Sequence, residues 1–217
     1  MDIEQARYNM IEQQIRPWEV LDPAVLAALA VVKREDFVLP EYRALAFVDT
    51  EVPLLNGQSM LAPKLEARLL QEVAVRPHEH VLEVGAGSGH MAALLAQRAA
   101  HVTTIEIDPE LARLADDNLR RAWVNNVTVL TGDASRPLPE GGPFDVIVLS
   151  GSVFEVPRSL LARLKTGGRL TGIVGSLPIM QAVLVTRSGE EGFSTVTLFD
   201  SVAPRLKNFG EPTRFVF

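Results

Sequence analysis

From His80 onward, short apolar runs alternate with amphipathic stretches, a pattern that predicts strands alternating with helices. Apolar residues fill most of each candidate strand, as expected when helices cover both faces of a parallel sheet. We therefore predict an α/β fold with a mostly parallel sheet and helices on both faces. The predicted strands are residues 80–84, 101–107, 126–133, 144–151 and 167–175, and the predicted helices between them are residues 91–98, 109–123 and 156–164.

The end of the chain has a different pattern. Two extended runs between residues 181 and 202 flank the short turn sequence Ser-Gly-Glu-Glu-Gly. Strands joined by so short a turn pair in opposite directions. The sequence therefore predicts a terminal antiparallel hairpin.

The first 75 residues look helical and irregular. One helix is expected over residues 3–15, and another from Asp22-Pro23, where aspartate can cap the helix and proline suits its first position. A further helix is expected from Pro63, after the loop NGQSMLAP. Its buried stripe at helical spacing is Leu65, Leu69 and Val73. We expect residues 1–75 to form an N-terminal helical cap that includes this loop, and residues 76–217 to form the core of one compact unit.

Composition narrows the class of protein. The 217 residues include 47% hydrophobic and 22% charged residues, which is ordinary for a soluble domain. A net charge of -6 disfavours a nucleic-acid partner, whose phosphates would need basic side chains. With no cysteine, the chain has neither disulfides nor thiolate metal sites. No apolar run reaches the roughly 20 residues of a membrane-spanning helix, and the first residues lack the apolar centre of a signal peptide. We expect a cytoplasmic protein without a membrane partner, and the sequence sets no oligomeric state.

The most distinctive stretch is VLEVGAGSGH, which starts at Val81. It runs from the first predicted strand through a turn to the start of the next helix. Gly85, Gly87 and Gly89 allow positive φ and let a ligand lie close to the backbone. The dinucleotide fingerprint would need its third glycine at the position of His90, and a Walker A loop is absent. The alternative is that these glycines only make a tight connection between strand and helix.

Acidic residues follow the next two predicted strands. Glu106 lies 21 positions after Gly85, where a carboxylate can accept both hydroxyl groups of a ribose. Asp133 ends the third strand and could accept a hydrogen bond from the amine of adenine, although such an aspartate is often only a turn residue. The carboxyl ends of parallel strands meet at one edge of a sheet, so these groups converge on one adenosine.

None of these features provides a phosphate site, which points to S-adenosyl-L-methionine as the cofactor. This choice also accounts for Glu83, an acidic residue inside an apolar strand. We expect Glu83 to accept hydrogen bonds from N–H groups of the neighbouring loop and to place negative charge near the sulfonium. A buried carboxylate without such partners would be costly.

Several segments together resemble one family. DPAVLAALAVVKREDFV, VPLLNGQSMLAP, VLEVGAGSGH, NVTVLTGDA and FDVIVLSGSVFEVPRSLLARLKTGGRL follow one another in the order and spacing of the protein-L-isoaspartate O-methyltransferases. These are class I methyltransferases, and the resemblance covers roughly residues 5 to 175. It implies a Rossmann-like sheet and cofactor-binding residues at Glu83, Gly85, Gly87, Gly89, Glu106, Ile107, Asp133, Ala134 and Ser150.

The resemblance also implies a reaction. The carboxylate of an isoaspartyl residue in a damaged protein attacks the methyl group, and the ester later collapses through a succinimide, which repairs the protein. The carboxylate is already ionised near neutral pH, so the reaction needs alignment rather than a strong base. No metal is expected.

The segments that would contact the acceptor depart from the family. The family serine usually called catalytic is replaced by Leu61, and Ser59 stands at the position of a threonine. After the fourth predicted strand, Ser-Gly-Ser-Val replaces Thr-Ala-Ala-Pro. We therefore keep three alternatives: isoaspartyl transfer with Ser59 and Leu61 at the catalytic positions, a methyltransferase with another acceptor such as a small molecule, and a catalytically silent cofactor-binding protein. A nucleic-acid amino-methyltransferase is disfavoured because its Asn/Asp-Pro-Pro-Tyr/Phe stretch is missing.

Overall fold

A computed structural model describes residues 2–137, 141–190 and 192–211. One residue of the predicted hairpin turn, Glu191, and the last residues of the C-terminal segment, 212–217, fall outside these ranges. No helix in the described ranges combines the length and the apolar character that crossing a membrane requires.

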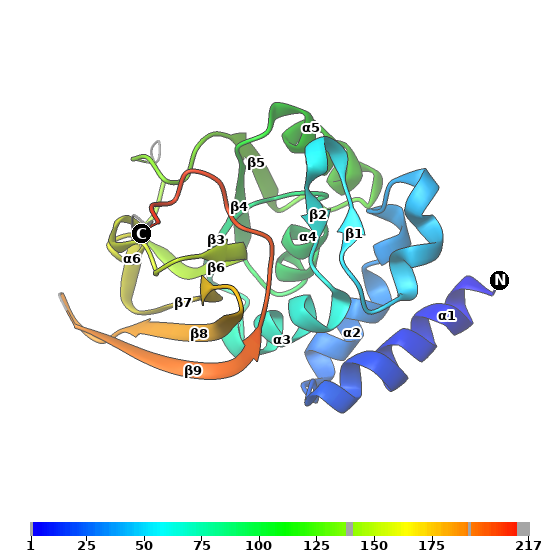
Figure 1. The fold of residues 1–217 in the computed structure, drawn as a ribbon, viewed down its shortest axis with the longest axis horizontal. Helices are drawn as coiled ribbons and strands as arrows, with labels where there is room; N and C mark the ends of the chain where they lie inside the picture. The colour runs from blue at the N-terminus through cyan, green and yellow to red at the C-terminus, as the bar shows by residue number, and fades with distance from the viewer. Residues whose placement is uncertain (1, 138–140, 191, 212–217) are drawn as a thin grey trace, which may run out of the picture.

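The centre of the molecule is a seven-stranded sheet in the order β5-β4-β3-β6-β7-β8-β9 (Figure 1). The pairs from β5 to β7 are parallel, and β7, β8 and β9 pair antiparallel with their neighbours. This confirms the α/β prediction and the terminal hairpin. The strands are β3 His80–Val84, β4 His101–Glu106, β5 Val127–Thr131, β6 Phe144–Val153, β7 Leu164–Ser176, β8 Ile179–Arg187 and β9 Phe193–Ser201.

The helices cover the two faces of the sheet unequally. One apolar cluster joins the N-terminal segments, α3, α4 and α5 to one set of strand residues. A second cluster lies on the alternate strand residues and is closed by α6, together with Leu206 and Phe209 near the C-terminus. The covering helices are α3 Pro63–Val73, α4 His90–Ala96, α5 Pro109–Arg121 and α6 Arg158–Leu161.

Local signals explain most helix boundaries. Asp108 caps α5, because its side chain accepts hydrogen bonds from the N–H groups of Glu110 and Leu111. The predicted buried stripe of α3 is confirmed, since Leu65, Leu69 and Val73 are all buried. The prediction of a helix over residues 156–164 is wrong at its end: α6 stops at Leu161 and β7 already begins at Leu164.

Residues 2–62 pack beside α3 as short helical segments and one small hairpin (Figure 1). The segment NGQSMLAP is not entirely a loop, because Ser59 and Met60 pair antiparallel with Pro53 and Val52. The elements are α1 Ile3–Asn9, the π-helix η1 Met10–Ile15, the 3-10 helix η2 Arg16–Trp18, α2 Pro23–Val31, the 3-10 helices η3 Arg34–Asp36 and η4 Pro40–Phe47, β1 Val52–Pro53, the 3-10 helix η5 Leu55–Gly57 and β2 Ser59–Met60.

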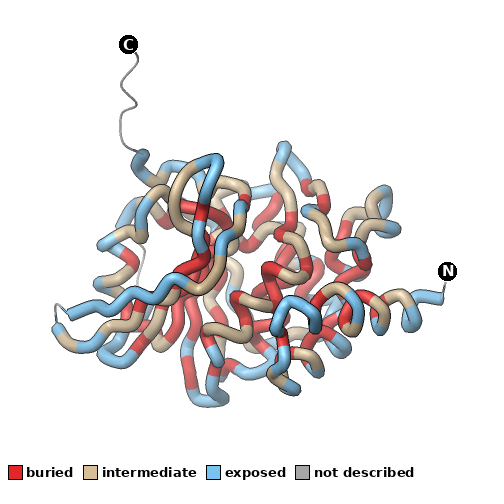
Figure 2. The backbone as a smooth tube through the Cα atoms, turned by 60° about the horizontal axis from the view of Figure 1, so that its bottom comes forward, coloured by how far each residue is buried: buried red, intermediate tan, exposed pale blue. Residues whose placement is uncertain are grey.

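Burial is highest in the middle of the sheet and falls towards its antiparallel edge. All strand residues from Val81 to Val84 in β3 are buried, whereas most of β9 is exposed (Figure 2). The buried strands β3 and β4 carry the glycine turn and Glu106 at their carboxyl ends, whereas β5, which leads to Asp133, has no fully buried residue.

Candidate functional site

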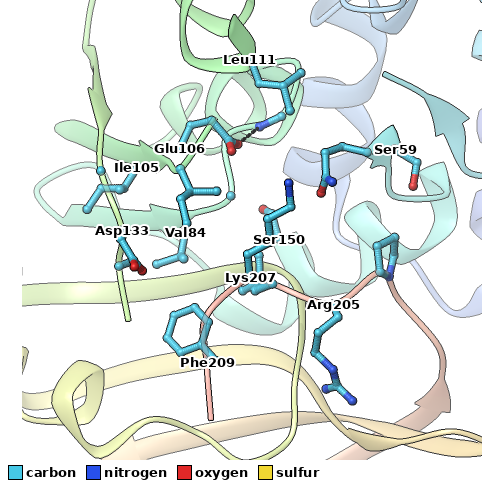
Figure 3. A pocket seen from close by; sticks show the side chains of 18 residues that line it. Ser59, Val84, Ile105, Glu106, Leu111, Asp133, Ser150, Arg205, Lys207 and Phe209 are labelled. Carbon is cyan, nitrogen blue, oxygen red and sulfur yellow. Dashed lines mark hydrogen bonds between the residues drawn. The ribbon is translucent and has the colours of Figure 1, made fainter. Parts of the chain in front are cut away.

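A cleft lies at the carboxyl ends of the parallel strands, where the strand order reverses between β3 and β6 (Figure 3). Open α/β sheets bind their ligands at this place. Residues from four strand ends, from the β1–β2 hairpin and from the C-terminal segment line the cleft. They are Gln58, Ser59, Val84, Gly85, Gly87, Ile105, Glu106, Ile107, Leu111, Gly132, Asp133, Ala134, Ser150, Pro204, Arg205, Leu206, Lys207 and Phe209.

The glycine turn has the backbone that its sequence predicts. Gly85, Gly87 and Gly89 have φ of +91°, +52° and +84°. Their N–H groups donate to the Ile105 carbonyl, to Glu106 and to the Ala86 carbonyl, so all three are used within the protein. The turn therefore does not offer these N–H groups as a cradle for phosphate.

Glu106 joins the glycine turn to the end of β4. Its Oε2 accepts from the Gly87 N–H at 2.8 Å (Figure 3), and its Oε1 accepts from the Asp108 N–H at 3.1 Å. The residue is 5% exposed and lines the cleft. Each carboxylate oxygen accepts more than one hydrogen bond. Two fixed oxygens at the mouth of the strand can thus receive a pair of ligand hydroxyl groups.

Asp133 lies at the carboxyl end of β5 and is engaged on both oxygens. Ser135 donates to Oδ1 through its N–H at 3.0 Å and its hydroxyl at 2.6 Å, while the Asn208 amide donates to Oδ2 at 2.9 Å. The Ser135 hydroxyl is the main cause of a lowered pKa for Asp133. A ligand amine that used Asp133 would share or replace the contact with Asn208.

Glu83 is fully buried in β3, and its partners differ from those expected. The expectation of loop N–H donors is wrong: Thr104 and Ser150 donate to Glu83 through their hydroxyl groups, at 2.7 and 2.6 Å. Burial raises the pKa of Glu83 to about 8, and the charges of Glu66 and Glu106 act in the same direction. The hydroxyl of Ser150 connects Glu83 to the cleft, because Ser150 itself lines the cleft.

The loop expected to contact the acceptor presents two residues to the cleft. Gln58 and Ser59 line it, and the Ser59 hydroxyl donates to Glu51 at 3.0 Å. The Leu61 side chain is only 4% exposed and belongs to the apolar core. In the described part of the chain, Leu61 is therefore separated from the cleft that Gln58 and Ser59 line.

The structure gathers most of the residues predicted from sequence at one cleft. Glu83, Gly89 and Leu61 are not among the described residues that line it: Glu83 lies behind Ser150, and Gly89 is the N-cap residue before α4. The predicted residues that do line it are Ser59, Gly85, Gly87, Glu106, Ile107, Asp133, Ala134 and Ser150.

Local sequence patterns did not predict that the C-terminal segment forms one wall of the cleft. Leu206 lies so close to the turn that a Cβ on Gly85 would come within 2.9 Å of its Cδ2. The segment is held by backbone hydrogen bonds between Ser152 and the residues Pro204 and Leu206. This wall depends on contacts between residues more than 50 positions apart, which no local pattern reports.

The family model and the most similar relatives that we compared name the same family. The model of the protein-L-isoaspartate(D-aspartate) O-methyltransferase family matches residues 5–202. A protein-L-isoaspartate O-methyltransferase of Koribacter versatilis is 41% identical over 181 residues, which cover 83% of this chain and 81% of that protein. One of Rhodopseudomonas palustris is 40% identical over 192 residues and 88% of each chain.

Solved structures show the same fold. A candidate protein-L-isoaspartate O-methyltransferase of Plasmodium falciparum, crystallised with S-adenosyl-L-homocysteine, superposes with a TM-score of 0.81. It covers 95% of this chain and 99% of its own, at 19% sequence identity. At that identity the likeness establishes the fold, while the family rests on the sequence matches.

Proposed function

The chain belongs to the protein-L-isoaspartate(D-aspartate) O-methyltransferase family, and from this premise we propose that it methylates a carboxylate of isoaspartyl residues in damaged proteins. It is a methyltransferase that uses S-adenosyl-L-methionine. The observation that carries the proposal is the pairing of Glu106 with the glycine turn at the reversal of strand order. This pairing leaves carboxylate oxygens, rather than backbone N–H groups, for the ligand.

The cleft fits an adenosyl group without phosphates. Glu106 would bind the ribose hydroxyl groups, and Ile107 and Ala134 would lie against the adenine. Asp133 would accept from the adenine amine in place of Asn208. The N–H groups of Gly85, Gly87 and Gly89 are already used within the protein, which would leave a pyrophosphate without these three donors.

The protein's own part in the reaction is to align the reactants and exclude water. When bound, S-adenosyl-L-methionine supplies a methyl group activated by a cationic sulfur. The Leu54 side chain, which follows β1, packs against Gly87. The Leu206 side chain, in the C-terminal segment, packs against Gly85. The acceptor carboxylate, with an ordinary pKa of about 4, is ionised without help from a base. Positioning then supplies most of the rate.

One observation favours a second candidate with a different acceptor. The hydroxyl group of Ser59 is bound to Glu51, so a negative charge stands beside the residue that faces the cleft. A carboxylate acceptor would find the Ser59 hydroxyl already donated to Glu51, whereas a hydroxyl or amine acceptor could donate to the Glu51 carboxylate. A methyltransferase acting on such a small molecule would use the same cofactor cleft.

Transfer of a labelled methyl group tests the two candidates together. The purified chain is incubated with labelled cofactor and either an isoaspartyl peptide or the aspartyl peptide of the same sequence, and cofactor binding is measured by calorimetry. We expect binding, and transfer to the isoaspartyl peptide alone. Binding without transfer would refute the repair proposal and leave either the second acceptor or a silent cofactor-binding protein.

We further propose that residues 1–75 act as a cap and acceptor loop on a cofactor-binding core of residues 76–217. The hairpin residue Asn56 supports this arrangement, because its amide donates to Asp108 and Glu110 of the core. We propose a cytoplasmic location, which the absence of cysteine supports.

A further inference from the structure

A buried cluster of charged and polar side chains lies where three segments meet. Arg34 comes from η3 in the cap, Glu66 from the first turn of α3, and His90 is the first residue of α4. They are 1%, 3% and 2% exposed. The first segment belongs to the cap, the second follows the loop of Gln58 and Ser59, and the third follows the glycine turn.

The contacts within the cluster are charged and directional. Arg34 Nη1 pairs with Glu66 Oε2, and His90 Nδ1 lies 3.0 Å from the same oxygen. Burial alone would raise the pKa of Glu66, but the Arg34 guanidinium and the His90 ring outweigh burial and hold it below its ordinary value. Glu66 is therefore ionised, and Arg34 has a charged partner.

The second terminal nitrogen of the Arg34 guanidinium contacts the acceptor loop. Its Nη2 donates to the backbone carbonyl of Leu61 at 2.7 Å. This carbonyl lies two residues beyond Ser59, which lines the cleft, and directly after β2. The Arg34 guanidinium thus binds the acceptor loop at the Leu61 carbonyl. Through Glu66 it is also connected to His90, which begins the helix after the glycine turn.

We propose that Arg34 is a positioning residue for methyl transfer, one that fixes the acceptor loop relative to the cofactor turn through Leu61 and Glu66. Arg34 is not among the described residues that line the cleft, so it acts through these contacts rather than on the reactants. The inference rests on the proposed function, because it assigns the reaction's alignment to this cluster. A misplacement of about 1 Å can lower a rate by about 100-fold.

Arg34→Lys separates this role from simple burial of charge. A lysine can pair with Glu66, but its single ammonium cannot also hold the Leu61 carbonyl in the fork geometry of arginine. Arg7 provides a matched control, since it is 4% exposed, pairs with the buried Glu35 and belongs to the same cap. Arg7→Lys therefore changes a similar buried ion pair, one whose contacts do not reach the acceptor loop.

The experiment compares the two variants with the wild type in three measurements. These are kcat and KM for the isoaspartyl peptide, cofactor Kd by calorimetry, and hydrogen exchange of backbone amides in residues 58–62. For Arg34→Lys we expect kcat to fall about 10- to 100-fold, cofactor Kd to change less than about threefold, and exchange to become faster. For Arg7→Lys we expect all three to stay near the wild-type values.

If Arg34→Lys matches Arg7→Lys in both kcat and exchange, the proposal is overturned. Should Arg34→Lys fail to fold, Arg34→Gln combined with Glu66→Gln removes both charges together and leaves no unpaired buried charge. The same losses are expected of it. If the wild type transfers no methyl group to the peptide, the proposed function fails, and the exchange measurement alone then decides whether Arg34 holds the loop.

Discussion

The buried carboxyl of Glu83 makes a stability prediction that depends on pH. Its pKa is raised from 4.5 to about 8 in the folded protein, mainly by burial. In the unfolded chain the group ionises near its ordinary value. Between these two pKa values the folded state binds the extra proton, so its contribution to stability is present below about pH 4.5 and is lost as pH rises through about 8.

The size of this effect follows from the two pKa values. Integrating proton binding between about pH 5.5 and 8.5 gives a loss of about 3 kcal/mol in the free energy of unfolding. Glu83→Gln keeps the volume and can still bond with the hydroxyl groups of Thr104 and Ser150, but it does not ionise. We therefore expect the variant to gain about 3 kcal/mol on the wild type across this range.

Urea unfolding at about pH 5.5, 7.0 and 8.5 measures both free energies. Ionisable groups that do not interact with Glu83 contribute equally to both proteins, so their effects cancel in the difference. Of the carboxylates that do interact with it, Glu66 has a lowered pKa and stays ionised over this range. A difference between variant and wild type that stays constant from the lowest to the highest pH would refute the assignment of Glu83 as a protonated buried carboxyl.

Three further predictions concern the cleft and the turn. Glu106→Ala should weaken cofactor binding by about 1–3 kcal/mol in calorimetry. Asp117→Ala, which removes an exposed carboxylate on α5, should leave the affinity unchanged. If both variants bind the cofactor equally well, Glu106 does not bind the ribose. Leu61→Ser should lower the free energy of unfolding in urea by about 2–4 kcal/mol without raising methyl transfer, because the side chain faces the core; increased transfer would contradict that orientation. Gly89→Ala should lower the melting temperature, since its φ is +84° and a Cβ would lie 3.1 Å from the Ala115 carbonyl oxygen; an unchanged melting temperature would contradict this.

Local patterns predicted the parallel core well because they depend on neighbouring residues. β3 spans His80 to Val84 as expected, since its side chains from Val81 onward are buried on both faces and the glycine turn ends it sharply. The positions of Glu106 and Asp133 at one cleft followed from the same logic, because parallel strands end at the same edge of the sheet.

Other features depend on distant contacts and could not be predicted. The pairing of β1 with β2 needs only two residues from each strand, too few for an alternating pattern to appear. Thr104 and Ser150 bind Glu83 from the neighbouring strands β4 and β6, so its partners follow from strand order rather than from nearby sequence. The C-terminal wall likewise depends on where Leu206 meets Gly85.

The Leu61 position shows how a motif can match while its geometry differs. The resemblance described from the sequence puts this residue where a serine is expected, which suggests a lost hydroxyl group at the acceptor. In the structure the Leu61 side chain is in the core and its carbonyl is bound by Arg34. The loop residues that line the cleft are Gln58 and Ser59, and the acceptor would meet these side chains.

We expect an adenosyl group without phosphates to lie across the carboxyl ends of β3, β4 and β5. A crystal structure of the protein grown with S-adenosyl-L-homocysteine tests it most directly. We expect both ribose hydroxyl groups within hydrogen-bond distance of Glu106 and the adenine beside Ile107 and Ala134. A cleft that stays empty at saturating ligand, or a ribose bound away from Glu106, would contradict the claim.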